Sequence, residues 1–282
     1  GFMVAVPEHP GSNKQQVQAL LEGIGRDVAE PVEFLDRPLD VQFLLNALQN
    51  LAQSDERFRG KLDATRAAII GQSFGGYTSL AAAGAPLDFA SLRQKCSQQL
   101  NTTLNFSLVL QCQALRQPSA QYQLADSRIK AAIAINPITS ALFSPASLAQ
   151  LQTPVMIVSG SDDVVAPALS EQIEPFTHLT TPQRYLALIK NSNHFSTIAP
   201  APADESSPIP QLQGLEGPAP DLARAYIKVL SLVFMDVYLK GESSLKGYLS
   251  PAGAATLSQS PLPLSIATVL PEKGLIPKDS PP

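Results

Sequence analysis

The chain has 282 residues, 44% of them hydrophobic, and its formal net charge at pH 7 is −4. This length and composition fit one large α/β domain or two small ones, and they argue against a wholly disordered chain. The mild acidity and the lack of basic clusters argue against a nucleic-acid-binding protein. The best candidate for a membrane span, residues 226–239, contains Lys228 and Asp236, so we expect no transmembrane segment.

Sequence patterns in the first third of the chain predict two strands and three helices. Residues 2–9 form a short apolar run that ends at a proline and a glycine, which is typical of a buried parallel strand. Residues 13–25 are expected to form a short helix and a loop. A longer helix is predicted over residues 37–53, where apolar side chains recur on one helical face at Val41, Leu44, Leu45, Leu48 and Leu51. Residues 64–71 predict a second strand, and residues 74–85 predict the helix after it.

The middle of the chain continues this alternation after an insertion. Residues 86–127 are expected to form an irregular, partly helical insertion. Three further strands are predicted at residues 128–137, 153–160 and 184–191, with a short helix at residues 171–176. Apolar strands that alternate with helices and end in turn residues indicate an α/β fold with a mostly parallel sheet flanked by helices.

The last third of the chain is rich in proline. Residues 199–220 are expected to form a long loop. Residues 221–242 predict a strong helix, with Asp221 placed to cap its start and Gly241 placed to end it. We therefore predict one domain over residues 1–250 and a proline-rich C-terminal tail over residues 251–282, of which residues 260–282 are expected to be loosely packed or disordered at the end.

The two cysteines, Cys96 and Cys112, both lie in the insertion. With no cluster of histidines or further cysteines nearby, they make a poor metal site. They form either a local disulfide or two free buried thiols, and the sequence leaves both open. A disulfide would suit a secreted or periplasmic protein, whereas free thiols would suit the cytoplasm.

Residues 71–75 read Gly-Gln-Ser-Phe-Gly, which fits the pattern G-x-S-x-G. In this pattern the serine lies on a sharp turn between a strand and a helix, and bulky side chains at the glycine positions would clash with neighbouring backbone. The turn exposes the hydroxyl of Ser73 above the carboxyl edge of the sheet. The N-terminus of the following helix offers free N–H groups to an oxyanion. Ser73 is therefore a candidate nucleophile.

A serine nucleophile needs a base, and the chain has only three histidines. His194 directly follows a predicted strand late in the chain, where reactive groups of an α/β sheet gather. His178 lies between a helix and a strand and is expected to be structural. His9 ends the first predicted strand, near the expected site, without a clear role. We take His194 as the candidate base.

The base in turn needs a carboxylate that fixes its tautomer and stabilises the imidazolium. Asp162 and Asp163 both follow the strand predicted at residues 153–160. Either can serve as the acid, and the other would then be a turn residue. The chain order serine, acid, histidine is the order that goes with the G-x-S-x-G turn.

The residues around these motifs resemble those of α/β-hydrolases, and most of all the bacterial dienelactone-hydrolase-like and platelet-activating-factor-acetylhydrolase-like esterases. The resemblance extends over residues 1–198, and four stretches and a short motif carry it: residues 1–12, 34–48, 62–84, 155–167 and 191–196. The family pattern G-x-x-D-x-x-x-P fits Gly160, Asp163 and Pro167, which favours Asp163 over Asp162 as the acid. Gln72 stands where many relatives have histidine.

The resemblance also implies that part of the family's fold lies upstream. Residues 2–9 resemble the fourth strand of the family's sheet, so the third strand and the loop that supplies one oxyanion N–H are expected to be missing. Only the N–H of Phe74 then remains in the oxyanion hole, and the chain is an N-terminally truncated hydrolase. In a less favoured alignment, residues 4–13 are the third strand, Gly11 or Ser12 donates the N–H, and residues 31–35 are a weak strand candidate.

The resemblance implies a serine hydrolase that cleaves carboxylic esters, with a small-molecule or lipid-like substrate and no metal or organic cofactor. A lactone hydrolase or a peptidase would share the same three residues. A catalytically inactive fragment or binding protein with this fold is the alternative from another class. The insertion and the proline-rich loop either cover the site and shape an acyl pocket or decorate the surface.

Overall fold

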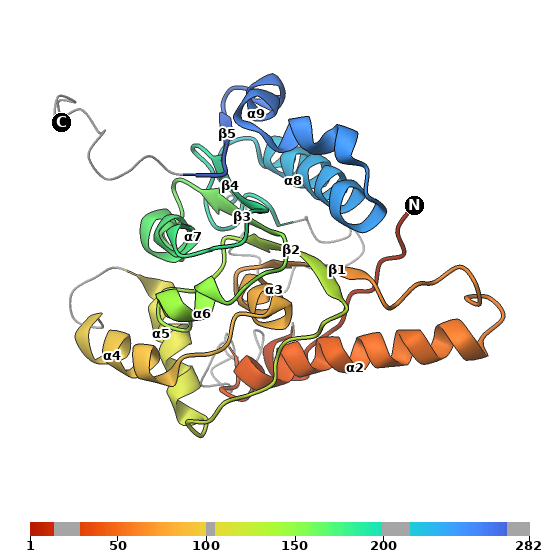
Figure 1. Cartoon of the computed structure of the whole chain (residues 1–282). Helices are drawn as coiled ribbons and strands as arrows, with labels where there is room; N and C mark the ends of the chain where they lie inside the picture. Colours follow the sequence, from red (N-terminus) through yellow and green to blue (C-terminus); the bar gives the residue numbers. More distant parts are fainter. Residues whose placement is uncertain (14–28, 100–104, 199–214, 270–282) are drawn as a thin grey trace.

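The computed structural model describes residues 1–13, 29–99, 105–198 and 215–269 (Figure 1). The predicted helix at residues 13–25 and most of the predicted loop at residues 199–220 fall outside these ranges. In the part that is described, no helix is both long and apolar enough to cross a membrane.

The sheet has five strands in the order β1-β2-β3-β4-β5, and the first four run parallel. They are β1 (Ala67–Gln72), β2 (Ile129–Ile135), β3 (Val155–Gly160) and β4 (Arg184–Ile189). The fifth strand, β5 (Leu264–Ala267), pairs antiparallel with β4. The predicted α/β class, with a mostly parallel sheet flanked by helices, is therefore confirmed.

The carboxyl ends of the four parallel strands meet at one edge of the sheet. The register pairs Gln72 with Ile135, Ile135 with Val158, and Gly160 with Ile189. Strands β2 and β3 are almost uniformly apolar because helices cover both of their faces, as is usual for parallel sheets. The loops that follow β1 to β4 therefore leave the sheet close together.

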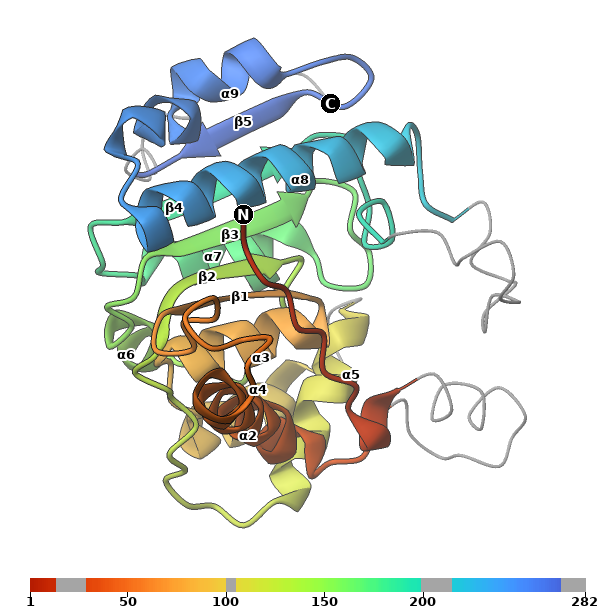
Figure 2. The same ribbon diagram turned by 90° about the vertical axis from the view of Figure 1, so that its right-hand side faces the viewer.

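Helices cover the two faces of the sheet and form two separate hydrophobic cores (Figures 1 and 2). On one face lie α2 (Glu33–Ser54), α3 (Phe74–Ala83) and the insertion. On the other face lie α8 (Pro220–Met235) and α9 (Pro251–Leu257). Alternate side chains of β2 point into the two cores, so the sheet separates the cores and contributes side chains to each. The weak strand candidate at residues 31–35 is wrong, because α2 begins within it.

The predicted helix at residues 221–242 is present, but its start differs from the prediction. The residue that caps α8 is Ala219, in the left-handed region with φ 49°, and Asp221 lies in the first turn. The helix continues as the π-helical turn η5 (Asp236–Lys240) and ends at Gly241, as predicted, where the backbone is left-handed with φ 81°.

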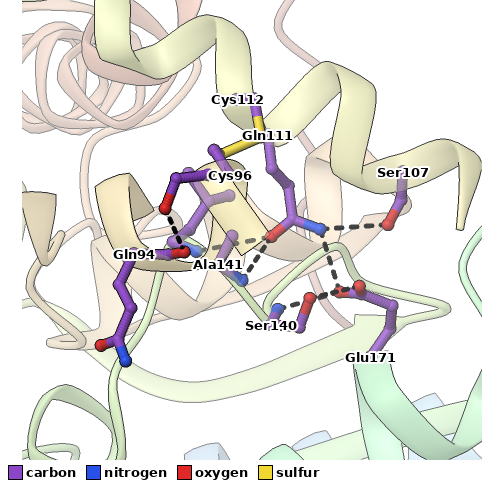
Figure 3. The surroundings of a disulfide bond; sticks show 10 residues. Gln94, Cys96, Ser107, Gln111, Cys112, Ser140, Ala141 and Glu171 are labelled. Carbon is purple, nitrogen blue, oxygen red and sulfur yellow. Dashed lines mark hydrogen bonds between the residues drawn. A yellow bond between two sulfur atoms is a disulfide. The ribbon is translucent and has the colours of Figure 1, made fainter. Parts of the chain in front are cut away.

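The insertion is partly helical, as predicted, and a disulfide closes it. It contains α4 (Phe89–Gln99), α5 (Phe106–Cys112) and the 3₁₀ turn η2 (Gln113–Arg116). Cys96 and Cys112 form a disulfide that ties α4 to α5 (Figure 3). The shorter elements that complete the fold are η1 (Pro10–Ser12), α6 (Pro145–Ala149), η3 (Leu169–Ile173), α7 (Glu174–Thr177) and η6 (Ser243–Leu249).

The strand predicted at residues 2–9 is not formed, and neither is the alternative strand over residues 4–13. Residues 1–9 run as an extended trace past β1, visible in red in Figure 2, without pairing to it. A cavity of about 790 Å³ separates this segment from β1 and α2. The apolar run pairs with no strand, because the cavity lies between it and the open edge of β1, and Val4 and Val6 are 80% and 89% exposed.

The described part of the proline-rich tail, residues 251–269, packs against the rest of the fold. Residues 251–269 form α9 and β5, and β5 hydrogen-bonds along β4 from Leu186 to Ile189. Leu262, Leu264 and Ile266 are buried in the core below α8. A proline in this region can begin a short packed element, since Pro251 lies in the first turn of α9.

Candidate active site

Ser73 lies at the turn between β1 and α3, in a backbone conformation that non-glycine residues rarely adopt (φ 56°, ψ −116°). Its N–H donates to the carbonyl oxygen of Ile135 on β2 at 2.8 Å. Because Phe74 is the first residue of α3, its N–H has no acceptor within the helix. The turn thus places the Ser73 hydroxyl next in sequence to a backbone donor at the start of a helix.

The glycines around Ser73 differ in how much space they need. A Cβ on Gly71 would lie 2.0 Å from the carbonyl oxygen of Gly75, so this position of the motif admits only glycine. A Cβ on Gly75 would meet only the Arg37 guanidinium, at an ordinary 3.8 Å. The expected clash at the second motif glycine is therefore wrong. The tight position is its neighbour Gly76, where a Cβ would lie 2.8 Å from Pro137.

His194 lies between Ser73 and Asp163. Its Nε2 is 2.9 Å from Ser73 Oγ, and its Nδ1 is 2.7 Å from Asp163 Oδ2. Since a carboxylate only accepts, Nδ1–H donates to Asp163 and leaves Nε2 as the acceptor for the serine hydroxyl. The imidazole is 5% exposed and the carboxylate group is fully buried. The structure thus brings together the three residues that the sequence nominated from three separate loops.

Asp163, and not Asp162, faces the histidine. Its second carboxylate oxygen accepts the N–H groups of Val165 and Ala166 at 2.9 and 2.7 Å, so the turn after β3 holds the carboxylate in place. The carboxylate of Asp162 accepts from Ser161 Oγ instead. The choice between the two aspartates came from the family resemblance, and the geometry agrees with it.

The loop that carries His194 is held by polar contacts on both sides. Gln72 Nε2 donates to the carbonyl oxygen of His194 at 2.9 Å. Asn193 Nδ2 donates to the carbonyl oxygen of Leu215, and the Phe195 ring meets the imidazole edge-on at 5.5 Å. Gln72, which the sequence analysis treated only as a variation at its position, thus links the nucleophile turn to the base.

The other two histidines are not part of this cluster. His9 Nδ1 lies 2.6 Å from Asp40 Oδ2, in a separate pair between the N-terminal segment and α2. His178 terminates α7, which agrees with the structural role expected for it. His9 is one of the residues that line the cavity beside β1.

The ring of Phe74 is fixed by aromatic and cationic neighbours. It packs against Phe34 and Tyr77, with ring centroids 4.7 and 5.6 Å away, and the Arg37 guanidinium lies 4.7 Å from its centroid. Burial lowers the pKa of Arg37 and raises that of Tyr77, whose hydroxyl donates to the carbonyl oxygen of Phe34. These contacts hold the first turn of α3 rigidly behind Ser73.

Ser12 does not supply the second oxyanion donor that the alternative alignment offered. Its N–H donates to the carbonyl oxygen of His9 at 3.1 Å. Its hydroxyl lies between Glu33 Oε2 and Arg37 Nη1, at 2.7 and 2.6 Å. The N–H and the hydroxyl of Ser12 are therefore both engaged, by the N-terminal segment and by α2.

Glu171, a buried carboxylate on η3 that the sequence alone did not indicate, joins the loop after β2 to the insertion (Figure 3). It is fully buried and accepts from the N–H groups of Thr139 and Ser140, at 2.7 and 2.9 Å, and from Gln111 Nε2 at 3.1 Å. Gln111 precedes Cys112, so this network also anchors the disulfide-bonded helix α5. A lone glutamate in a short amphipathic stretch gives no sequence signal for such a role.

Two further observations bear on the identity of the site. Nowhere in the described ranges do three His, Cys, Asp or Glu side chains gather as a metal site requires. Comparisons of the chain with family models and with curated proteins find no match. The local geometry therefore carries the functional argument by itself.

Proposed function

We propose that this protein is a serine hydrolase of the α/β-hydrolase fold that cleaves carboxylic esters through an acyl-enzyme. The observation that carries the proposal is the position of His194, within hydrogen-bonding distance of both Ser73 Oγ and Asp163 Oδ2. A strained serine turn, a buried imidazole and a buried carboxylate in this order match the requirements of nucleophilic catalysis.

In the first half-reaction, Ser73 Oγ attacks the ester carbonyl carbon. His194 Nε2 takes the hydroxyl proton as the new C–O bond forms, and the imidazolium is stabilised through Nδ1–H by Asp163. When the tetrahedral intermediate collapses, the ester C–O bond breaks and His194 gives its proton to the leaving alcohol. The acyl group remains as an ester on Ser73.

In the second half-reaction, water replaces the alcohol. His194 removes a proton from a water molecule, which attacks the acyl carbon, and then returns the proton to Ser73 Oγ as the carboxylic acid leaves. The same three side chains thus serve both steps, and neither step consumes another reactant.

The N–H of Phe74 is the proposed donor to the oxyanion. It belongs to the first turn of α3, where the helix dipole and the free N–H groups favour negative charge. Loss of one such donor typically costs ~10²–10³ in kcat. A second donor is not assigned.

Exposed apolar side chains near the acid turn support an ester with an apolar acyl group. The N–H of Ser107 donates to the carbonyl oxygen of Val165 at 2.8 Å, which places α5 against the turn that holds Asp163. Phe106 and Val109 on α5 are 60% and 56% exposed, and Val164 on the acid turn is 67% exposed. We infer that the insertion lines one side of the site.

The test is turnover of nitrophenyl esters of short and medium chain length by the protein and four variants. We expect Ser73→Ala and His194→Gln to lose at least ~10³-fold in kcat, and Asp163→Asn to lose on the order of 10²–10⁴-fold. Asp162→Asn is the matched control and should stay within twofold. Undiminished turnover in Ser73→Ala would refute the proposal.

A further inference from the structure

We propose that Asn136 is a positioning residue for the reaction, and that its side-chain amide aligns the candidate acid and base with Ser73. The inference rests on the proposed function. Asn136 touches neither Ser73 nor the imidazole through any recorded contact, so it acts through the backbone of the loops that carry Asp163 and His194.

Asn136 follows the last residue of β2, the strand that lies between the nucleophile strand β1 and the acid strand β3. It is 1% exposed and adopts a left-handed backbone conformation with φ 41°. Its N–H donates to the carbonyl oxygen of Val158 on β3 at 2.8 Å. Asparagine is one of the few residues other than glycine that tolerate this conformation.

The side-chain amide connects two loops at once. Its Oδ1 accepts the N–H of Gly160, the last residue of β3, at 2.9 Å. Its Nδ2 points to the carbonyl oxygens of Asn193 and His194, at 3.4 and 3.5 Å. One planar group therefore fixes the end of the acid strand relative to the base loop, and the carbonyl of His194 is held by two amides, those of Asn136 and Gln72.

The neighbours of Asn136 in sequence reach the nucleophile turn. The carbonyl oxygen of Ile135 accepts the N–H of Ser73, and Pro137 packs against Gly76 on the first turn of α3. Three consecutive residues, 135–137, thus contact the elements that carry the nucleophile, the acid and the base. Asparagine offers an acceptor, a donor and a tolerated left-handed backbone here, whereas an ionised aspartate lacks the donor and glycine lacks the side chain.

The base loop also packs too closely against β3 to shift without cost. A Cβ on Gly160 would lie 2.6 Å from the carbonyl oxygen of Ser192, and that oxygen accepts the N–H of Asp162 at 2.9 Å. The backbone contact at Gly160 and the amide of Asn136 therefore act together to set the height of the base loop above the sheet. A displacement of about 1 Å at the reacting groups can cost on the order of 10²-fold in rate.

The experiment compares Asn136→Gly and Asn136→Asp with Asn191→Gly. Glycine keeps the left-handed backbone and removes both arms of the amide, whereas aspartate keeps the acceptor for Gly160 and loses the donor to the base loop. Asn191 is the control, because it is also left-handed (φ 62°) and its Nδ2 binds only Pro261, away from Ser73. If Asn136→Gly fails to fold, Asn136→Asp carries the test.

The first readout is the steady-state kinetics of ester hydrolysis. We expect both Asn136 variants to lose on the order of 10- to 100-fold in kcat with KM within about threefold, since no substrate contact is removed. A merely structural role would lower the melting temperature without this loss of kcat in the folded fraction. A kcat within twofold of Asn191→Gly in both variants would overturn the proposal.

The second readout does not depend on turnover. A proton held between a histidine Nδ1 and a buried carboxylate gives a far-downfield NMR resonance, which Asp163→Asn identifies by removing it. We expect this resonance to shift or disappear in both Asn136 variants and to persist in Asn191→Gly. If the wild-type protein hydrolyses no ester, the proposed function fails. The positioning role is tested separately, because a resonance that is unchanged in both Asn136 variants would refute it.

Discussion

Single residues at the turn between β1 and α3 store strain that their neighbours hold in place. A non-glycine residue with the φ of Ser73 costs on the order of 1–3 kcal/mol, so the surrounding contacts must stabilise it. The close approaches at Gly71 and Gly76 are those contacts. They let the first turn of α3 lie directly against the end of β1 and against Pro137. The carbonyl oxygen of Gly75 is the atom that approaches Gly71, but a Cβ on Gly75 itself would make only an ordinary contact with Arg37.

This difference predicts opposite outcomes for two adjacent substitutions. Gly76→Ala pushes a methyl group to 2.8 Å from Pro137 and should lower the melting temperature by several degrees and reduce activity. Gly75→Ala meets open space inside a helix and should leave the melting temperature unchanged or slightly raised. Thermal unfolding followed by circular dichroism checks both. Equal loss in the two variants would contradict the packing described for the turn.

At the scale of elements, an ion pair at the start of β2 joins the sheet to α2. Arg128 Nη2 lies 2.6 Å from Asp126 Oδ2, and the same guanidinium donates to Gln49 Oε1 and to the carbonyl oxygen of Gln42 on α2. The N–H of Asp126 donates to the carbonyl oxygen of Ala82 on α3. The hydrogen bonds from Arg128 lower the pKa of Asp126 below its usual range.

The lowered pKa gives this pair a defined pH dependence. Asp126→Asn removes a carboxylate that is more acidic in the folded than in the unfolded chain, so the free energy of unfolding at pH 7 should fall by about 1–3 kcal/mol. The difference from wild type should persist above the ordinary aspartate pKa of about 4 and vanish as the pH falls through the lowered folded value. Urea unfolding at several pH values measures it. Asp221→Asn, which breaks an exposed pair with Arg224, is the control and should change little.

At the scale of the whole molecule, β1 is the outer strand of the described sheet on the side of the N-terminal segment. Its side chains are less buried than those of β2 and β3, and Ile70 is 41% exposed. The cavity of about 790 Å³ beside it leaves the outer backbone groups of β1 open, and a half-exposed apolar edge strand is a site of association between chains.

The open edge predicts that the protein associates as its concentration rises. Ile70→Lys places a charge on that edge and should reduce the association without loss of the fold. Sedimentation velocity across a concentration series tests the prediction, with Leu232→Lys as the control, because Leu232 is 54% exposed on α8 and away from β1. Association that is equal in both variants would show that the edge is not responsible.

The sequence predicts the parallel strands well, because each is a buried apolar run between turn residues. It fails at residues 2–9 and 251–269 for opposite physical reasons. The first run is apolar, but a cavity lies between it and the open edge of β1, so it makes no backbone hydrogen bonds with that strand and composition alone cannot form one. The second is rich in proline, yet β5 finds a partner in β4, and pairing of this kind depends on tertiary contacts.

Some residues of the candidate site can likewise be predicted from the sequence, and others cannot. Ser73, His194 and Asp163 are predictable because each follows an apolar strand and the motif around the serine is local. The roles of Asn136 and Glu171 are not, since they depend on which loops the sheet register brings together. A polar residue directly after a buried strand, as in Ile135-Asn136-Pro137, is a usable clue to such a role.

The most direct test of the central claim, that Ser73 is a nucleophile activated by His194, is labelling with a fluorophosphonate followed by peptide mass spectrometry. We expect one phosphonyl group per chain, on Ser73, with no labelling of Ser73→Ala and much slower labelling of His194→Gln. Labelling at another residue, or undiminished labelling of Ser73→Ala, would contradict it.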